Sequence, residues 1–215
     1  MEYKYILFDL DGTLLDSSEG ICEGVNAATE RFSLPALDME TRKKFIGPSL
    51  RASFCKYCGV SEETAEEMLA AYREYYGIEG LYRCKPYDGI EKVLSYLNDA
   101  GHICYVATAK PTAYAEKMLE KWDMLKYFKK VIGASFDKSK IDKKDMIEEI
   151  LTVENSKSAI MVGDTRYDIE GAKLCNIDSV AVTYGFGDVD EIISEGPDHN
   201  VKDTDELLKL MKTFR

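Results

Sequence analysis

Five short apolar runs, set among helical patterns, constrain the fold of this chain more than any other feature of its sequence. Amphipathic helical patterns occur at 89–100, 111–122, 143–152, 166–175 and 203–213. The apolar runs lack regular polar alternation, so each predicts a strand that is buried on both faces of a parallel sheet. Strands that alternate with helices predict a doubly wound α/β fold with a Rossmann-like parallel sheet. The runs are 5–8, 103–108, 130–134, 159–163 and 179–185.

One segment interrupts this alternation. Residues 17–81 carry helical periodicity alone, with breaks at Pro35 and at Gly47-Pro48. The helices that we expect there are 18–32, 38–45, 50–58 and 61–76. The chain therefore predicts an α/β core made of residues 1–16 and 82–215, with a small all-helical cap, residues 17–81, inserted after the first strand.

The net charge limits the partners of the chain. Its 28 basic and 39 acidic residues give a net charge of −11, which argues against a nucleic-acid or anionic-membrane surface. The N-terminus has no signal-peptide pattern, and no apolar run approaches the roughly 20 residues that span a bilayer. Six scattered cysteines fit reduced thiols. We expect a cytoplasmic protein, monomeric or weakly dimeric, without nucleic-acid or membrane partners.

Acidic residues follow two of the predicted strands. Asp9 and Asp11 come directly after the run 5–8, Asp164 follows the run 159–163, and Asp168 lies in the first turn of the next helix. Ligand sites in open α/β sheets lie beyond the carboxyl ends of the strands. Gly12 permits a turn there that few other residues accept. Four carboxylates form an oxygen-rich site that favours Mg²⁺, and a chain with only two histidines argues against zinc.

Between the two acidic pairs lie residues suited to binding an anion. Thr108 ends a predicted strand, and Pro111 suits the first position of the helix that follows. A hydroxyl and free N–H groups at a helix N-terminus form an anion site. Local positive charge could come from one of three lysines that precede the helix 143–152 or begin it, namely Lys140, Lys143 and Lys144.

Together these pieces resemble the haloacid dehalogenase superfamily, in its helical-cap branch of phosphoglycolate phosphatases and 5′-nucleotidase-like proteins. The motifs are DLDGT (Asp9, Asp11), ATAK (Thr108), a lysine near 140–144, and GDTRYD (Asp164, Asp168). Spacing to Met146 and Ile147 favours Lys143 as the motif lysine, then Lys144, then Lys140. Two departures are the missing proline after that lysine and Ala109 after the motif threonine.

The resemblance implies a Mg²⁺-dependent phosphatase that hydrolyses a small phosphorylated metabolite of the phosphoglycolate or nucleoside monophosphate class. Asp9 would be the nucleophile that forms an aspartyl-phosphate, and Asp11 the general acid and base. Mg²⁺ would be held by Asp9, the Asp11 carbonyl and Asp164, with Asp168 close by. The phosphate-binding residues would be Asp9, Gly12, Thr108, Ala109 and Lys143.

Several alternatives stay open at this stage. A phosphomutase shares the aspartyl-phosphate, although those mutases tend to carry Glu-Asp where this chain has Gly163-Asp164; a non-catalytic regulatory module of the same fold is a further possibility. Asp11 argues against a true dehalogenase. Among single residues, Asp16 is expected to be an N-cap or hinge, Cys55 and Cys58 half-buried or buried thiols, and the Gly47-Pro48 turn with Arg51 is an open specificity loop. Lys110 could contact substrate or be a solvated helix start.

Overall fold

The computed structural model describes residues 2–134 and 142–214, and these residues divide into two compact units. Ser17–Lys85 forms one unit, and the chain up to Asp16 and from Pro86 forms the other. The division therefore falls at Lys85, whereas the sequence predicted that the helical insert ends at residue 81. Two short strands, β2 (Leu15–Asp16) and β3 (Lys85–Pro86), lie along the chain at the two borders.

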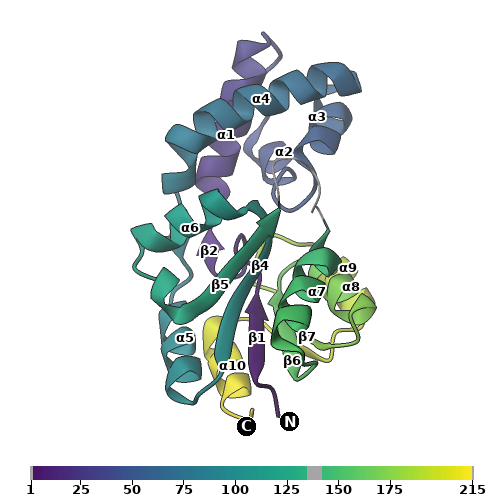
Figure 1. Cartoon of the computed structure of the whole chain (residues 1–215). Helices are drawn as coiled ribbons and strands as arrows, with labels where there is room; N and C mark the ends of the chain where they lie inside the picture. Colours follow the sequence, from purple (N-terminus) through teal and green to yellow (C-terminus); the bar gives the residue numbers. More distant parts are fainter. Residues whose placement is uncertain (1, 135–141, 215) are drawn as a thin grey trace. The chain divides into compact units, whose positions relative to one another are not determined.

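The larger unit contains a six-stranded sheet in the order β5-β4-β1-β6-β7-β8, and every neighbouring pair is parallel. The doubly wound α/β prediction is thus confirmed (Figure 1). The sixth strand, β8, was not predicted because it is three residues long and only Val201 in it is buried. The bounds are β1 (Tyr5–Phe8), β4 (Ile103–Pro111), β5 (Phe128–Ala134), β6 (Ala159–Gly163), β7 (Asp178–Val182) and β8 (His199–Val201).

Helices cover both faces of this sheet, α7 and α8 on one side and α5 and α10 on the other (Figure 1). Side chains of β1 alternate accordingly: Tyr5 and Leu7 pack in a core cluster with residues of α7 and α8, while Ile6 and Phe8 are fully buried facing the other way. The bounds are α5 (Ile90–Asp99), α6 (Thr112–Lys121), η2 (Leu125–Tyr127), α7 (Lys143–Glu154), α8 (Arg166–Leu174), α9 (Val189–Ser194) and α10 (Thr204–Met211).

The regular elements of the second unit are helices, apart from Lys85, which is the first residue of β3. These helices are α1 (Ser18–Arg31), α2 (Met39–Lys43), α3 (Leu50–Cys58), α4 (Glu62–Ile78) and the short η1 (Gly80–Tyr82). The side chains of Asp38 and Ser61 cap α2 and α4 by accepting the N–H groups of Thr41 and Thr64. The start of α1 packs directly on η1, because a Cβ at Gly20 would lie 2.0 Å from the carbonyl oxygen of Gly80.

The topology of the sheet predicts where a ligand binds. Strand β1 pairs with β4 on one side and with β6 on the other. Its last residue, Phe8, lies opposite both Val106 and Val162. The carboxyl ends of these three strands are therefore neighbours at the point where strand order reverses, which is where ligands bind in open α/β sheets. In residues 2–134 and 142–214, no helix is long and apolar enough to cross a bilayer.

Candidate active site

Three carboxylates meet at the carboxyl ends of β1 and β6. Asp9 follows β1, Asp164 follows β6, and Asp168 lies in the first turn of α8. They are 7%, 1% and 0% exposed, and each offers an oxygen within 4.8 Å of the other two. The structure thus brings together the acidic residues that two distant motifs supply.

Lys143 places a buried positive charge among these acids. Its Nζ lies 2.7 Å from Asp9 Oδ1 and 2.7 Å from Asp168 Oδ1, and it donates a 2.8 Å hydrogen bond to the carbonyl oxygen of Ala107. Lys143 begins α7 and is 8% exposed, whereas Lys144 beside it pairs with Glu148 on the surface. Of these two lysines, only Lys143 reaches the acids; Lys140 lies outside the described residues.

The electrostatics of the site favour additional positive charge. Burial raises the pKa of Asp164 well above its usual value, and the negative charges of Asp9 and Asp168 raise it further. Burial also raises the pKa of Asp9, although Lys143 opposes the shift. For Lys143, burial lowers the pKa, but the carboxylates of Asp168 and Asp9 outweigh burial and the net shift is upward. One ammonium does not balance three buried carboxylates.

A divalent cation fits this site. Its candidate ligand atoms are all carboxylate oxygens, which Mg²⁺ prefers, and they converge closely enough to share one ion. The cation would also supply the positive charge that the buried acids lack. Asp9, Asp164 and Asp168 are therefore residues that could hold a metal.

Asp164 is held in place by donors that the motif analysis did not identify. Thr13, which is fully buried, donates from Oγ1 to Asp164 Oδ1 at 3.0 Å. The backbone N–H of Phe186 donates to Asp164 Oδ2 at 2.8 Å, and that of Gly187 does so at 3.4 Å. The loop after β7 thus serves the site, although the sequence predicted that residues 183–185 continue the strand. Its backbone donors have no side-chain signature that a motif search could find.

Glycines allow the backbone to close around the acids. A Cβ at Gly12 would lie 2.1 Å from Asp164 Oδ2, and Gly12 has φ +87°, a conformation that side chains disfavour. A Cβ at Gly163 would lie 2.2 Å from Cγ of Asp168. At Gly185 a Cβ would lie 2.3 Å from Cβ of Asp164. The N–H of Gly12 donates to the carbonyl oxygen of Leu15, so this glycine shapes the turn.

Asp168 has a structural task besides its charge. Its Oδ2 accepts hydrogen bonds from the N–H of Thr165 at 3.0 Å and from the Thr165 hydroxyl at 2.8 Å. These contacts form part of a capping box at the start of α8. Oδ2 of Asp168 caps α8, while its Oδ1 faces Lys143. Asp168 therefore links Lys143 to the start of α8, the helix that follows β6.

Asp11 and Lys110 form a second charged pair at the same edge of the sheet. Lys110 Nζ lies 3.0 Å from Asp11 Oδ2, and the side chains are 7% and 18% exposed respectively. Lys110 belongs to β4, and the residue is 9% exposed. The alternative that Lys110 is a solvated helix start is therefore wrong.

Three further predicted residues, Thr108, Ala109 and Pro111, lie at the end of β4. Thr108 is 1% exposed and accepts the N–H of Lys110 at its Oγ1, and Ala109 is exposed. Pro111 is the last residue of β4 and the N-cap of α6, so its predicted place as first helical residue is one position early. Asp16 is not the N-cap of α1, because Ser17 occupies that position.

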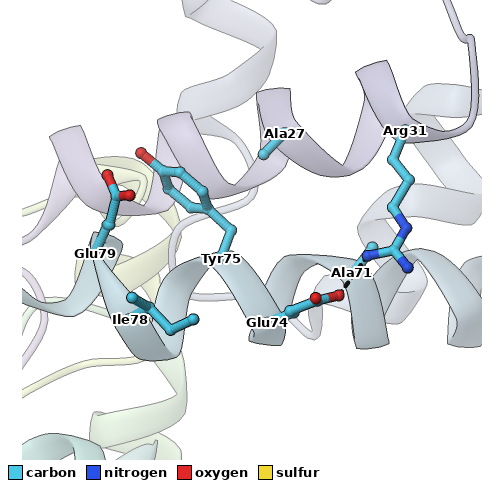
Figure 2. A pocket seen from close by; sticks show the side chains of 7 residues that line it. All are labelled: Ala27, Arg31, Ala71, Glu74, Tyr75, Ile78 and Glu79. Carbon is cyan, nitrogen blue, oxygen red and sulfur yellow. Dashed lines mark hydrogen bonds and ion pairs between the residues drawn. The ribbon is translucent and has the colours of Figure 1, made fainter.

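Two further features of the helical unit stand apart from this chemistry. Cys55 and Cys58 are free thiols of intermediate burial, as predicted, and they belong to no metal-binding cluster within the described ranges. A depression of about 250 Å³ lies between α1 and α4 (Figure 2). None of the predicted site residues lines it; its walls are Ala27, Arg31, Ala71, Glu74, Tyr75, Ile78 and Glu79.

Comparison with known proteins places this arrangement in a family. The haloacid dehalogenase-like hydrolase family matches residues 6–182. A 5′-nucleotidase from Pseudomonas aeruginosa is 34% identical over 99% of this chain and 97% of its own length. A phosphoglycolate phosphatase from Vibrio parahaemolyticus is 27% identical over 98% of the chain and 96% of its own length. Tyrosine-protein kinase PtkA of Mycobacterium tuberculosis is 33% identical over 88% of the chain, which spans 65% of that relative.

The solved structures agree with the sequence comparisons. The crystal structure of a predicted phosphatase from Clostridium acetobutylicum is 40% identical, with a TM-score of 0.93. The match covers 99% of this chain and 100% of that one. The predicted family resemblance is confirmed. The chain belongs to the haloacid dehalogenase-like hydrolase family, and its likeness to the 5′-nucleotidase, the phosphoglycolate phosphatase and the predicted phosphatase shows that it is a phosphoric monoester hydrolase.

Proposed function

We propose that this chain is a Mg²⁺-dependent phosphatase that hydrolyses a small phosphomonoester through an aspartyl-phosphate on Asp9. The observation that carries the proposal is the buried cluster of Asp9, Asp164 and Asp168 with Lys143 between them. Phosphoryl transfer needs positioned groups and neutralised charge more than it needs reactive side chains. This site positions such groups at the ends of three adjacent strands, and Lys143 together with a bound Mg²⁺ would neutralise the charge.

Asp9 is the proposed nucleophile. An oxygen of its carboxylate attacks phosphorus, the bond from phosphorus to the leaving oxygen breaks, and the leaving group takes a proton from Asp11. Water then attacks the aspartyl-phosphate and gives a proton to Asp11, which restores both residues and releases phosphate. Lys143 holds Asp9 Oδ1 in place and offsets negative charge during both steps.

The other residues bind and orient. Thr108 and the N–H of Ala109 are proposed to bind phosphate oxygens at the end of β4, together with Lys143 and Gly12. Asp9, Asp164 and the carbonyl of Asp11 would hold Mg²⁺, with Asp168 beside them. The metal would neutralise negative charge on the phosphoryl group as it is transferred.

The proposed substrate is a small phosphorylated metabolite, phosphoglycolate or a nucleoside monophosphate. The support is the names of the two relatives that align with nearly the full chain. The Gly47-Pro48 turn with Arg51 remains a candidate for substrate discrimination within the helical unit. A screen of phosphate release across a panel of phosphorylated metabolites tests the substrate class.

The mechanism is tested with p-nitrophenyl phosphate. The wild type is expected to release phosphate with Mg²⁺ and to stop when the metal is chelated, and Asp9→Asn is expected to be inactive. Asp123→Asn is a matched control, because Asp123 is an exposed acid in an αL turn that asparagine accepts. Acid-quenched enzyme should carry a phosphoryl group on the peptide that contains Asp9.

The alternatives predict different products. A phosphomutase would return the phosphate on another hydroxyl of its substrate and release little inorganic phosphate. A non-catalytic module would release none with any divalent metal and would leave Asp9 unmodified, an outcome that contradicts the proposal.

A further inference from the structure

The pair of Lys110 and Asp11 holds one oxygen of the carboxylate and leaves the other available. Asp11 Oδ2 lies 3.0 Å from the ammonium of Lys110. Asp11 Oδ1 is buried and has no hydrogen-bond donor among the residues that the structure describes. Burying a carboxylate oxygen without a donor is costly, so an unpaired one at an active site indicates an atom kept for a ligand.

The backbone of Lys110 also contacts a predicted site residue. It lies two residues after Thr108, and its own N–H donates to Thr108 Oγ1 at 3.2 Å. This contact ties the position of its backbone to the threonine of the predicted ATAK motif. Its side chain is 7% exposed, so the ammonium is largely removed from solvent and the ion pair is poorly screened.

The ion pair of Lys110 and Asp11 also affects the net charge of the site. Four carboxylates gather at this edge, and Lys143 and Lys110 contribute two positive charges. When all four acids are ionised, those two cations leave a net charge of −2, which one divalent ion would neutralise. Lys110 thus balances Asp11, just as Lys143 faces Asp9 and Asp168.

We propose that Lys110 is a positioning residue for the leaving-group step: it holds Asp11 by Oδ2 so that the free Oδ1 faces the oxygen that must be protonated. This inference rests on the proposed phosphatase function and adds a residue to it. In the absence of Lys110 the Asp11 side chain would lose its fixed rotamer, and proton delivery to the leaving oxygen would fail. Phosphate binding by Thr108 and Lys143 would remain.

The test compares two esters of similar shape, p-nitrophenyl phosphate and phenyl phosphate, with Mg²⁺. The phenolate of the second is the more basic leaving group and depends more on the proton from Asp11. The measured quantity is the ratio of kcat/KM for the nitrophenyl ester to kcat/KM for the phenyl ester. Because kcat/KM covers binding and the first chemical step, a loss of phosphate affinity common to both esters cancels in this ratio.

In Lys110→Met the ratio is expected to rise on the order of tenfold, since general acids commonly contribute 10²–10⁴-fold and a displaced one keeps part of this. Lys110→Arg, which retains the charge and its donors, should restore much of the difference. In Asp11→Asn the ratio should already be high, and adding Lys110→Met should raise it no further. The control is Lys130→Met, because Lys130 makes an ion pair of the same 3.0 Å length with Glu149 on the exposed surface.

Each other outcome overturns the inference. If Lys110→Met lowers kcat/KM for both esters equally, Lys110 contributes charge or stability and does not position Asp11. If the ratio changes as much in the Asp11→Asn background as in the wild type, Lys110 acts independently of Asp11. Lys110→Gln is measured beside the methionine variant in case the latter folds poorly. A wild type that cleaves neither ester contradicts the phosphatase itself, which separates that failure from the failure of this inference.

Discussion

Lys143 Nζ lies 2.7 Å from Asp9 Oδ1, so the first turn of α7 meets the end of β1 across 134 residues of sequence. The same ammonium lies 2.7 Å from Asp168 Oδ1, which ties β1 to α8 as well. Removing one partner of a buried ion pair strongly destabilises the folded protein, because the remaining charge stays buried without a counter-charge. The active-site charges are therefore also part of the folded core.

The first prediction concerns Lys143. Lys143→Met should lower phosphatase activity about 100-fold or more and the free energy of unfolding by about 3 kcal/mol at neutral pH, because Asp9 and Asp168 lose their shared cation. Lys144→Met is the matched control, since Lys144 is 43% exposed and pairs only at 3.4 Å with Glu148. Activity assays and urea unfolding measure both effects. Equal losses in the two variants would contradict the assignment of Lys143.

The second prediction concerns the turn after β1. Gly12 and Gly101 have φ of +87° and +88°, but a Cβ at Gly12 would collide with Asp164, whereas one at Gly101 would meet open space. Alanine at either site should cost about 1 kcal/mol of stability through backbone strain. Only Gly12→Ala should also displace Asp164 and lower activity on the order of 100-fold. Preserved activity in Gly12→Ala would show that the turn can relax.

The third prediction concerns the hydrogen bond from Thr13 to Asp164 Oδ1. Thr13→Val keeps the shape but removes the donor, so the free energy of unfolding should fall by about 1–2 kcal/mol. Loss of an orienting partner commonly weakens metal binding about tenfold or more. The rise in melting temperature on adding Mg²⁺ should therefore need higher Mg²⁺ in this variant, and Thr13→Ser should behave like the wild type. An unchanged Mg²⁺ titration would rule out this role.

The fourth prediction concerns the pH dependence of stability at Glu154, which is not one of the active-site acids. Glu154 accepts hydrogen bonds from Lys129 and Tyr105, and these contacts lower the pKa of Glu154 to about 2 from its usual 4.5. A lowered carboxyl pKa stabilises the fold above the unfolded-state pKa, and the contribution disappears as the pH falls toward the folded-state value.

Glu154→Gln should therefore lose about 1 kcal/mol at neutral pH, a small figure because Lys129 is 51% exposed and water screens the pair. The difference from the wild type should shrink as the pH drops below about 4.5 and approach zero near 2. Urea unfolding at a series of pH values measures it. A difference that stays constant across this range would contradict the assigned cause.

Much of the fold follows from local patterns. The first strand and the start of α7 occur where apolar runs and amphipathic periodicity predict them, since those patterns record which faces are buried. Short polar elements carry no such record: β8 has a single buried residue, and it is held by pairing with β7, which no local pattern reveals.

The family, the parallel sheet and the acids at two strand ends can be predicted from the sequence alone, because motif residues and the pattern of buried positions can be identified along the chain without knowledge of its packing. The tertiary structure decided which lysines face which acids. Lys143 and Lys144 are neighbours in sequence, yet the helix turns one toward Asp9 and the other toward the surface. It also decided that Thr13 and the loop after β7 hold Asp164, since hydrogen bonds between distant segments depend on packing in three dimensions.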